Sequence, residues 1–107
     1  MTWASQYIDK LKNGETVSFR PIGGSMSGLI ESGQLCTVEP ISKFAFSGKG
    51  QLMVGDIVLV KVNGSDYLHL IKKICDNQYQ IGNNKGRING WVELDSIFGV
   101  LVDINRE

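Results

Sequence analysis

The chain has 107 residues, of which 42% are apolar and only two are prolines, a composition typical of one folded domain with a modest core. Lysine and arginine together number 11, as do aspartate and glutamate, so neither a nucleic acid nor an anionic membrane surface is an expected partner. The longest apolar runs, such as residues 57–60 and 97–102, are well short of the roughly 20 residues that cross a bilayer, so no membrane span is expected.

The first 14 residues are predicted to form the one helix of the chain. Its expected N-cap is Thr2, and Asn13 and Gly14 supply its end. One face carries apolar residues at helical spacing: Trp3, Tyr7, Ile8 and Leu11. We expect this helix to pack its aromatic side against the rest of the domain.

Residues 15–104 are predicted to form a β core, because apolar residues there recur with a period of two between Gly, Asn, Asp and Ser. Asn63 and Gly64 begin a tight hairpin turn, and residues 42–51 are expected to be a surface loop. The fold class is therefore mostly β: a short N-terminal helix and a coiled, partly closed antiparallel sheet, in a single domain over residues 1–107. The predicted strands are 17–19, 35–38, 57–62, 67–74, 79–81, 90–92 and 97–104.

Cys36 and Cys75 are the only cysteines, and their spacing fits no metal site. Both stand among apolar residues in predicted strands, so we expect both thiols to be buried and structural. Two lone thiols without a secretory leader indicate a reducing compartment. We therefore expect a cytoplasmic protein that holds no metal and no cofactor.

A serine between a glycine pair and a methionine is the most distinctive local feature. Gly24 lets a substrate backbone come close, and Ser25 can project its hydroxyl with backbone amides beside it, as an oxyanion site requires. Serine is a poor nucleophile until a base takes its proton, and His69 is the only histidine. The alternative is that 23–25 is simply a turn and that His69 is a partly buried histidine satisfied by a backbone carbonyl.

Several short segments between residues 17 and 102 share their order and spacing with a known peptidase core. They are Gly24-Ser25-Met26, residues 30–33, Gly55-Asp56-Ile57-Val58, Tyr67-Leu68-His69 and Ile97-Phe98-Gly99-Val100. Together they resemble the core shared by LexA-type repressors and type I signal peptidases. The resemblance implies a soluble serine peptidase with Ser25 as nucleophile, and with His69 as base, as in the histidine-type branch of that superfamily.

Lys72 is the rival base, because Lys72 and Lys73 resemble the Lys-Arg pair of the bacterial enzymes. On a regular strand His69 and Lys72 face opposite sides, so both reach Ser25 only if the strand carries a bulge. Burial can lower the pKa of a lysine enough to make it a base, whereas histidine titrates near neutrality without such tuning. We therefore favour His69.

Residues near the motif are expected to support it. Met26 is expected to pack beneath the serine, while Gly28 replaces a proline of the family pattern. Asn83 stands where the family has a carboxylate, with Asn89 as a second such candidate, and an amide cannot stabilise an imidazolium as a carboxylate does. Asn83 and Asn84 are expected either at the rim of the site, holding the histidine or the substrate, or in a plain hairpin loop.

Three functions follow from these features. The first is a serine peptidase that hydrolyses a peptide or protein substrate through Ser25 and His69. The second is a catalytically inactive module of the same fold, which binds a peptide or protein partner by strand addition. The third is a regulatory partner of a repressor system that forms a homodimer through its sheet. A complete repressor is not expected, since the chain has no helix-turn-helix segment.

Overall fold

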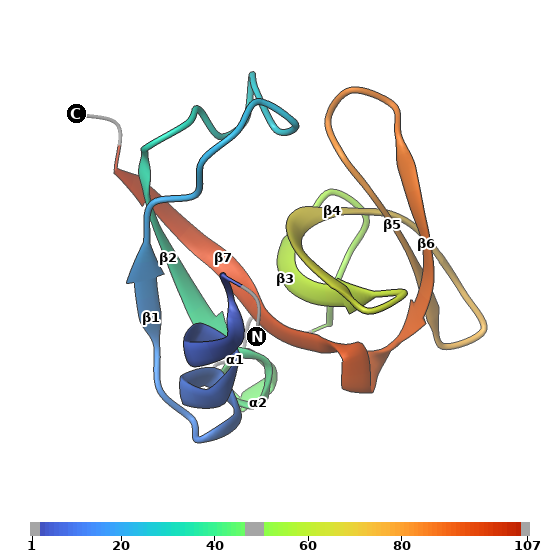
Figure 1. Ribbon diagram of the computed structural model, residues 1–107. Helices are drawn as coiled ribbons and strands as arrows, with labels where there is room; N and C mark the ends of the chain where they lie inside the picture. The colour runs from blue at the N-terminus through green and yellow to red at the C-terminus, as the bar shows by residue number, and fades with distance from the viewer. Residues whose placement is uncertain (1–2, 47–50, 106–107) are drawn as a thin grey trace.

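The computed structural model of the protein describes residues 3–46 and 51–105 (Figure 1). Nearly half of these residues belong to strands of one antiparallel sheet, with helices beside it. In chain order the elements are α1 (Ser5–Lys12), β1 (Val17–Phe19), β2 (Leu35–Pro40), α2 (Ile41–Phe46), β3 (Ile57–Val62), β4 (Ser65–Cys75), β5 (Gln78–Gly82), β6 (Ile88–Glu93), the 3-10 turn η1 (Leu94–Ser96) and β7 (Ile97–Asn105).

All seven predicted strands are present, several of them longer than expected. The helix is shorter than the predicted 1–14: Trp3 and Ala4 form a turn before it, and the expected cap Thr2 lies outside the described residues. The loop predicted for 42–51 is wrong in its first part, because Ile41–Phe46 forms α2. Ile41 is partly buried against the core. The loop is predicted from the lysines, glycines and small residues of 42–51, which give no sign of this contact. Residues 47–50 lie outside the described residues.

The strands form one sheet in the order β1-β2-β7-β3-β4-β5-β6. Within the described ranges, the first and last strands of this order do not pair with each other, so the sheet is not closed. Figure 1 shows β7 running between the part with β1 and β2 and the part with β3 to β6. Four register shifts, which bend a sheet, lie at 37/38 in β2, 59/60 in β3, 71/73 in β4 and 81/82 in β5.

Both faces of β3 are covered, which explains its almost uninterrupted apolar sequence. Leu59 joins a core cluster with residues of α1, β1 and β2. Val58 and Val60 point the other way, into a second cluster with residues of β5, β6 and β7. Burying a side chain of this size stabilises the fold by about 1.5–3 kcal/mol, so β3 anchors the sheet from both sides.

Helix α1 lies against the sheet through Ile8 and Leu11, both buried. A Cβ at Gly99 in β7 would lie 2.6 Å from the carbonyl oxygen of Glu39 and 3.1 Å from Leu11 Cδ1, so only glycine permits this close packing. Tyr7 stacks on Phe19 of β1 at 4.6 Å between ring centroids. The helix is thereby held beside the segment that leads from β1 to Ser25.

The two cysteines differ in environment, and both are free. Cys36 in β2 is buried, as expected, and its burial raises the pKa of the thiol. Cys75 is exposed, contrary to the prediction, because the last residues of β4 extend past the core. No helix in the described part of the chain is long and apolar enough to cross a membrane.

Candidate active site

Ser25 stands in a series of tight turns between β1 and β2. The N–H of Ser27 donates to the carbonyl of Gly24 at 3.2 Å, and the N–H of Ile30 donates to the carbonyl of Met26 at 2.8 Å. Met26 is 5% exposed, so it anchors the turn in the core, as expected from the sequence. The backbone thus holds Ser25, itself exposed, in a fixed position at the surface.

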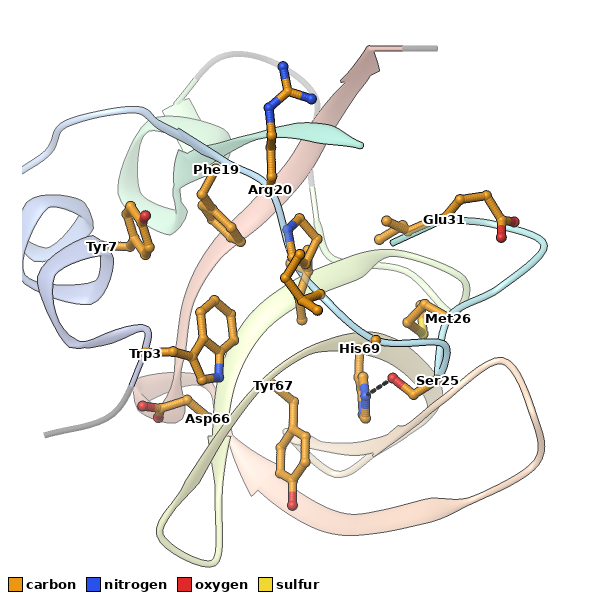
Figure 2. A pocket seen from close by; sticks show the side chains of 15 residues that line it. Trp3, Tyr7, Phe19, Arg20, Ser25, Met26, Glu31, Asp66, Tyr67 and His69 are labelled. Atoms are coloured by element: carbon orange, nitrogen blue, oxygen red, sulfur yellow. Dashed lines mark hydrogen bonds between the residues drawn. The ribbon is translucent and has the colours of Figure 1, made fainter. Parts of the chain in front are cut away.

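The structure brings Ser25 and His69 together, although 44 positions separate them. Ser25 Oγ lies 3.2 Å from Nε2 of His69, which is carried by the central part of β4 (Figure 2). In β4, His69 is paired with Val58 of the buried strand β3, so its backbone position is set by the sheet. This distance is within the range of a hydrogen bond between a nucleophile and its base.

Asn89 in β6 holds the other side of the His69 ring. Its Oδ1 lies 2.7 Å from His69 Nδ1. Because a carbonyl oxygen only accepts hydrogen bonds, Nδ1 carries the ring proton, and the lone pair of Nε2 faces the hydroxyl of Ser25. Ser25 then donates to Nε2, which is the tautomer that a general base requires. Of the asparagines considered from the sequence, Asn89 is the one that binds this ring.

His69 is buried, at 6% exposure, and the ring of Tyr67 stacks on it at 4.7 Å between centroids. This burial lowers the pKa of His69 below its usual value of 6.5. The hydrogen bond that His69 donates to Asn89 raises the pKa, while the positive charge of Arg87 lowers it further. The imidazole is therefore neutral at neutral pH and able to accept a proton.

Lys72, the rival base, is bonded elsewhere. Its Nζ donates to the carbonyl oxygen of Asn83 at 3.0 Å. The register of β4 shifts between Ile71 and Lys73, so Lys72 is the extra residue of a bulge. Its amine supports the loop between β5 and β6, whereas His69 is the base candidate placed at the serine hydroxyl.

Asn84 connects the β5–β6 loop to the turns around Ser25, residues 24–30, which are called the serine turn below. Its backbone N–H donates to the carbonyl of Ser25 at 3.2 Å, and its side-chain Nδ2 donates to the carbonyl of Ser27 at 2.8 Å. Asn83 instead shapes its own loop, since its Oδ1 accepts from the N–H groups of Lys85 and Arg87. Asn84 thus borders the candidate site, as the first interpretation expected, but it bonds to the turn around Ser25 rather than to the histidine.

Gly28, which replaces a proline of the family pattern, has a backbone reason to be glycine. Its φ is +97°, a conformation that L side chains rarely adopt and that proline, fixed near −65°, cannot adopt. A Cβ there would also lie 3.1 Å from Nδ2 of Asn84. The departure at residue 28 therefore fits the contact between Asn84 and the serine turn.

A cavity of about 400 Å³ lies beside the pair, between α1, β1, the serine turn and β4 (Figure 2). Ser25 and His69 form part of its wall. Its aromatic and aliphatic lining includes Trp3, Tyr7, Phe19, Met26, Ile30 and Leu68. The sequence assigned Trp3 and Tyr7 to helix packing, because an aromatic at helical spacing gives no sign that it also borders a cavity.

The described residues contain no group of three or more His, Cys, Asp or Glu residues arranged to hold a metal ion. A scan against protein-family models found no family that matches the sequence, and a search of curated proteins found no matching relative. The function proposed for the protein therefore rests on the geometry of Ser25, His69 and Asn89.

Proposed function

We propose that the protein is a serine hydrolase that cleaves peptide bonds, with Ser25 as nucleophile, His69 as general base and Asn89 as the residue that orients the base. The observation that carries the proposal is the pair of contacts made by one ring: Nε2 to Ser25 Oγ at 3.2 Å and Nδ1 to Asn89 Oδ1 at 2.7 Å. The chain order, with the serine in a turn and the base on a later strand, also supports kinship with the LexA and signal peptidase superfamily.

The reaction proceeds in two steps through an acyl-enzyme. Nε2 of His69 takes the hydroxyl proton as Ser25 Oγ bonds to the peptide carbonyl carbon, and the carbonyl oxygen becomes an oxyanion. The imidazolium then gives its proton to the leaving amine as the C–N bond breaks. A water molecule loses a proton to His69 as it attacks the ester, and the proton returns to Ser25 as the acid is released.

The backbone at the nucleophile can stabilise the oxyanion. Within the described residues, the N–H of Ser25 makes no hydrogen bond to a protein acceptor, although the neighbouring N–H groups of Gly23 and Ser27 do. An N–H donor beside the attacked carbonyl stabilises the charge that develops on its oxygen. The serine turn is therefore suited to supply one donor from the nucleophile itself.

The amide of Asn89 limits the expected rate. It orients His69 as the asparagine of papain-like Cys-His-Asn sites orients its histidine, but it brings no negative charge to the imidazolium. Arg87 also disfavours the protonated ring, since its charge lowers the pKa of His69. We expect acylation at Ser25 to be readily measured and turnover to be slow. A module that binds peptides without cleaving them is the alternative that the missing carboxylate favours.

Labelling with a small fluorophosphonate tests the proposal. Ser25 Oγ forms a bond to phosphorus as fluoride leaves and His69 takes the proton, and peptide mapping locates the adduct. We expect a label on Ser25 in the wild type, none in Ser25→Ala, and a rate lower by at least about 100-fold in His69→Gln. Ser65→Ala, at the exposed first residue of β4, is the matched serine control and keeps the label.

Lys72→Met separates the two candidate bases. It removes the amine but keeps an unbranched side chain, so we expect labelling at close to the wild-type rate. Loss of the label in this variant with His69→Gln unaffected would assign the base to Lys72. A folded wild type that takes no label would remove the hydrolase proposal and leave the binding module.

A further inference from the structure

We propose that the substrate carries a large apolar side chain on the residue whose carbonyl is attacked, and that the cavity between α1 and β4 receives it. This inference rests on the proposed function and specifies its substrate class. Ser25 and His69 line the same cavity as Trp3 and Tyr7. A side chain attached next to a carbonyl at Ser25 can therefore enter this cavity.

Three aromatic rings form one side of the cavity. Phe19 is buried, Tyr7 stacks on it, and Trp3 lies against it at 5.6 Å with the ring planes tilted by 57°. Trp3 is 50% exposed, so much of its ring is available to contact a ligand (Figure 2). Apolar and aromatic groups pack favourably on such ring faces and edges.

Aliphatic residues and a methionine also line the cavity. Met26 and Ile30 come from the serine turn, Leu68 comes from β4, and all three are buried. The cavity volume of about 400 Å³ exceeds what a methyl group such as that of alanine can fill. A small side chain would leave most of the lining residues without contacts, whereas a phenyl or branched aliphatic group could contact both the aromatic and the aliphatic ones.

The charged residues around the cavity do not select a charged side chain. Asp66, with its side chain 1% exposed, has Oδ1 2.8 Å from Nζ of Lys61, so its charge is compensated. Arg20 donates to the carbonyl of Gly33 at 2.8 Å. Glu31, of opposite charge to Arg20, accepts the N–H of Gly28 at 2.7 Å. Asp66 is thus paired with a lysine, while Arg20 and Glu31 are hydrogen-bonded to the backbone. We therefore expect burial of apolar surface to contribute most of the binding free energy in the cavity.

Two peptidyl diphenyl phosphonates, identical except for phenylalanine or alanine at the reacting residue, test the inference. Ser25 Oγ bonds to phosphorus, phenoxide leaves, and His69 takes the hydroxyl proton, so the second-order rate of inactivation reports binding beside the nucleophile. We expect the wild type to react at least about tenfold faster with the phenylalanine probe. Equal rates with both probes would overturn the inference.

Trp3 and Trp91 provide a matched pair of substitutions. Trp3→Ala is expected to bring the phenylalanine rate close to the alanine rate. Trp3→Phe, which restores a ring, is expected to recover most of the preference. Trp91 is exposed to a similar extent, at 44%, but does not line the cavity, so Trp91→Ala keeps the wild-type ratio. A ratio that falls equally in the Trp3 and Trp91 variants would contradict a role for the cavity.

The small fluorophosphonate distinguishes the two proposals, because it carries no side chain to bury. If it labels Ser25 and the two peptidyl probes react equally, the cavity assignment fails and the hydrolase proposal stands. If it labels nothing in the folded protein, the hydrolase proposal itself fails. Labelling by the small probe in Trp3→Ala also verifies that this variant is folded.

Discussion

Asn89 and His69 meet through an amide oxygen and a ring nitrogen 2.7 Å apart, and this contact fixes which nitrogen of the ring faces Ser25. An amide in this place directs the ring without adding charge, unlike the carboxylate of a Ser-His-Asp triad. The orientation of the base and the stabilisation of its protonated form are therefore separate properties of this site, and substitutions can test each.

Two substitutions at Asn89 are expected to act in opposite directions. Asn89→Ala removes the acceptor from the buried Nδ1 and frees the ring, so we expect fluorophosphonate labelling of Ser25 to slow by about 100-fold. Asn89→Asp keeps the acceptor and adds a negative charge, which raises the pKa of His69 and makes it a stronger base. Labelling at alkaline pH is then expected to be faster than in the wild type. Equal losses in both variants would show that Asn89 serves only packing.

The rate of labelling is expected to follow the neutral form of His69. Because burial lowers the pKa of His69, the half-maximal rate should fall below pH 6.5 as the reaction is followed from about pH 8 to pH 5. Arg87→Gln removes a positive charge that lowers the same pKa, so its half-maximal rate should move to higher pH. A wild-type midpoint above 6.5 would contradict the buried, neutral imidazole.

Protein stability is expected to depend on the same group. His69 has a lower pKa in the folded protein than its ordinary value of 6.5, so the unfolded chain binds more protons between these two values. The stabilisation is fully present above pH 6.5 and is lost as the pH falls through the folded pKa. Urea unfolding of the wild type and of His69→Gln should therefore show a difference in unfolding free energy that declines in this window. A constant difference would exclude the linkage.

Asn84 is expected to matter more for reactivity than for stability. Asn84→Asp keeps the size and the backbone N–H but replaces the donor to the Ser27 carbonyl with an acceptor. Because this hydrogen bond is exposed, water can replace it, and the loss of unfolding free energy should be about 1 kcal/mol or less. We expect the labelling rate to drop severalfold as the serine turn loosens. Asn84→Ala should behave similarly, and unchanged labelling in both variants would refute this role.

Substitutions at Gly28 and Gly14 separate the effect of backbone strain on stability from an effect on the contact with Asn84. Both have positive φ, +97° and +84°, so an alanine at either position should destabilise the fold by about 1–2 kcal/mol. A Cβ at residue 28 also meets Asn84, while one at residue 14 meets nothing within 4 Å. We therefore expect Gly28→Ala to slow labelling of Ser25 and Gly14→Ala to leave it unchanged, with unfolding curves measured alongside.

The strands could be predicted from the sequence because short apolar or alternating runs end clearly at Gly, Asn, Asp or Ser. The turn at Asn63 and Gly64 is an example, with φ values of +50° and +83° that these two residue types tolerate well. Helix α2 could not be predicted in the same way, since it is short and its attachment to the core through Ile41 depends on the completed sheet. Tertiary packing, rather than local propensity, decides such a segment.

The sequence predicts that Ser25 and His69 lie together, and the structure shows their contact, but the geometry around them could not be predicted. Asn89 opposes no residue of β5, because Ile81 pairs with Gly90 and Gly82 pairs with Ile88. Lys72 is likewise the extra residue of a bulge in β4. Simple alternation along a strand predicts where side chains point, and it fails at a bulge. The third member of the site and the exclusion of the rival amine both depend on such irregularities.

The link between Asn84 and the serine turn has a consequence for the newly made protein. A ribosome completes Ser25 long before it reaches Asn84 and Asn89, so a growing chain carries the hydroxyl without the loop that steadies it or the amide that aims its base. Under the proposed chemistry, the chain can hydrolyse a substrate only after the β5–β6 hairpin has been synthesised and has packed against the serine turn.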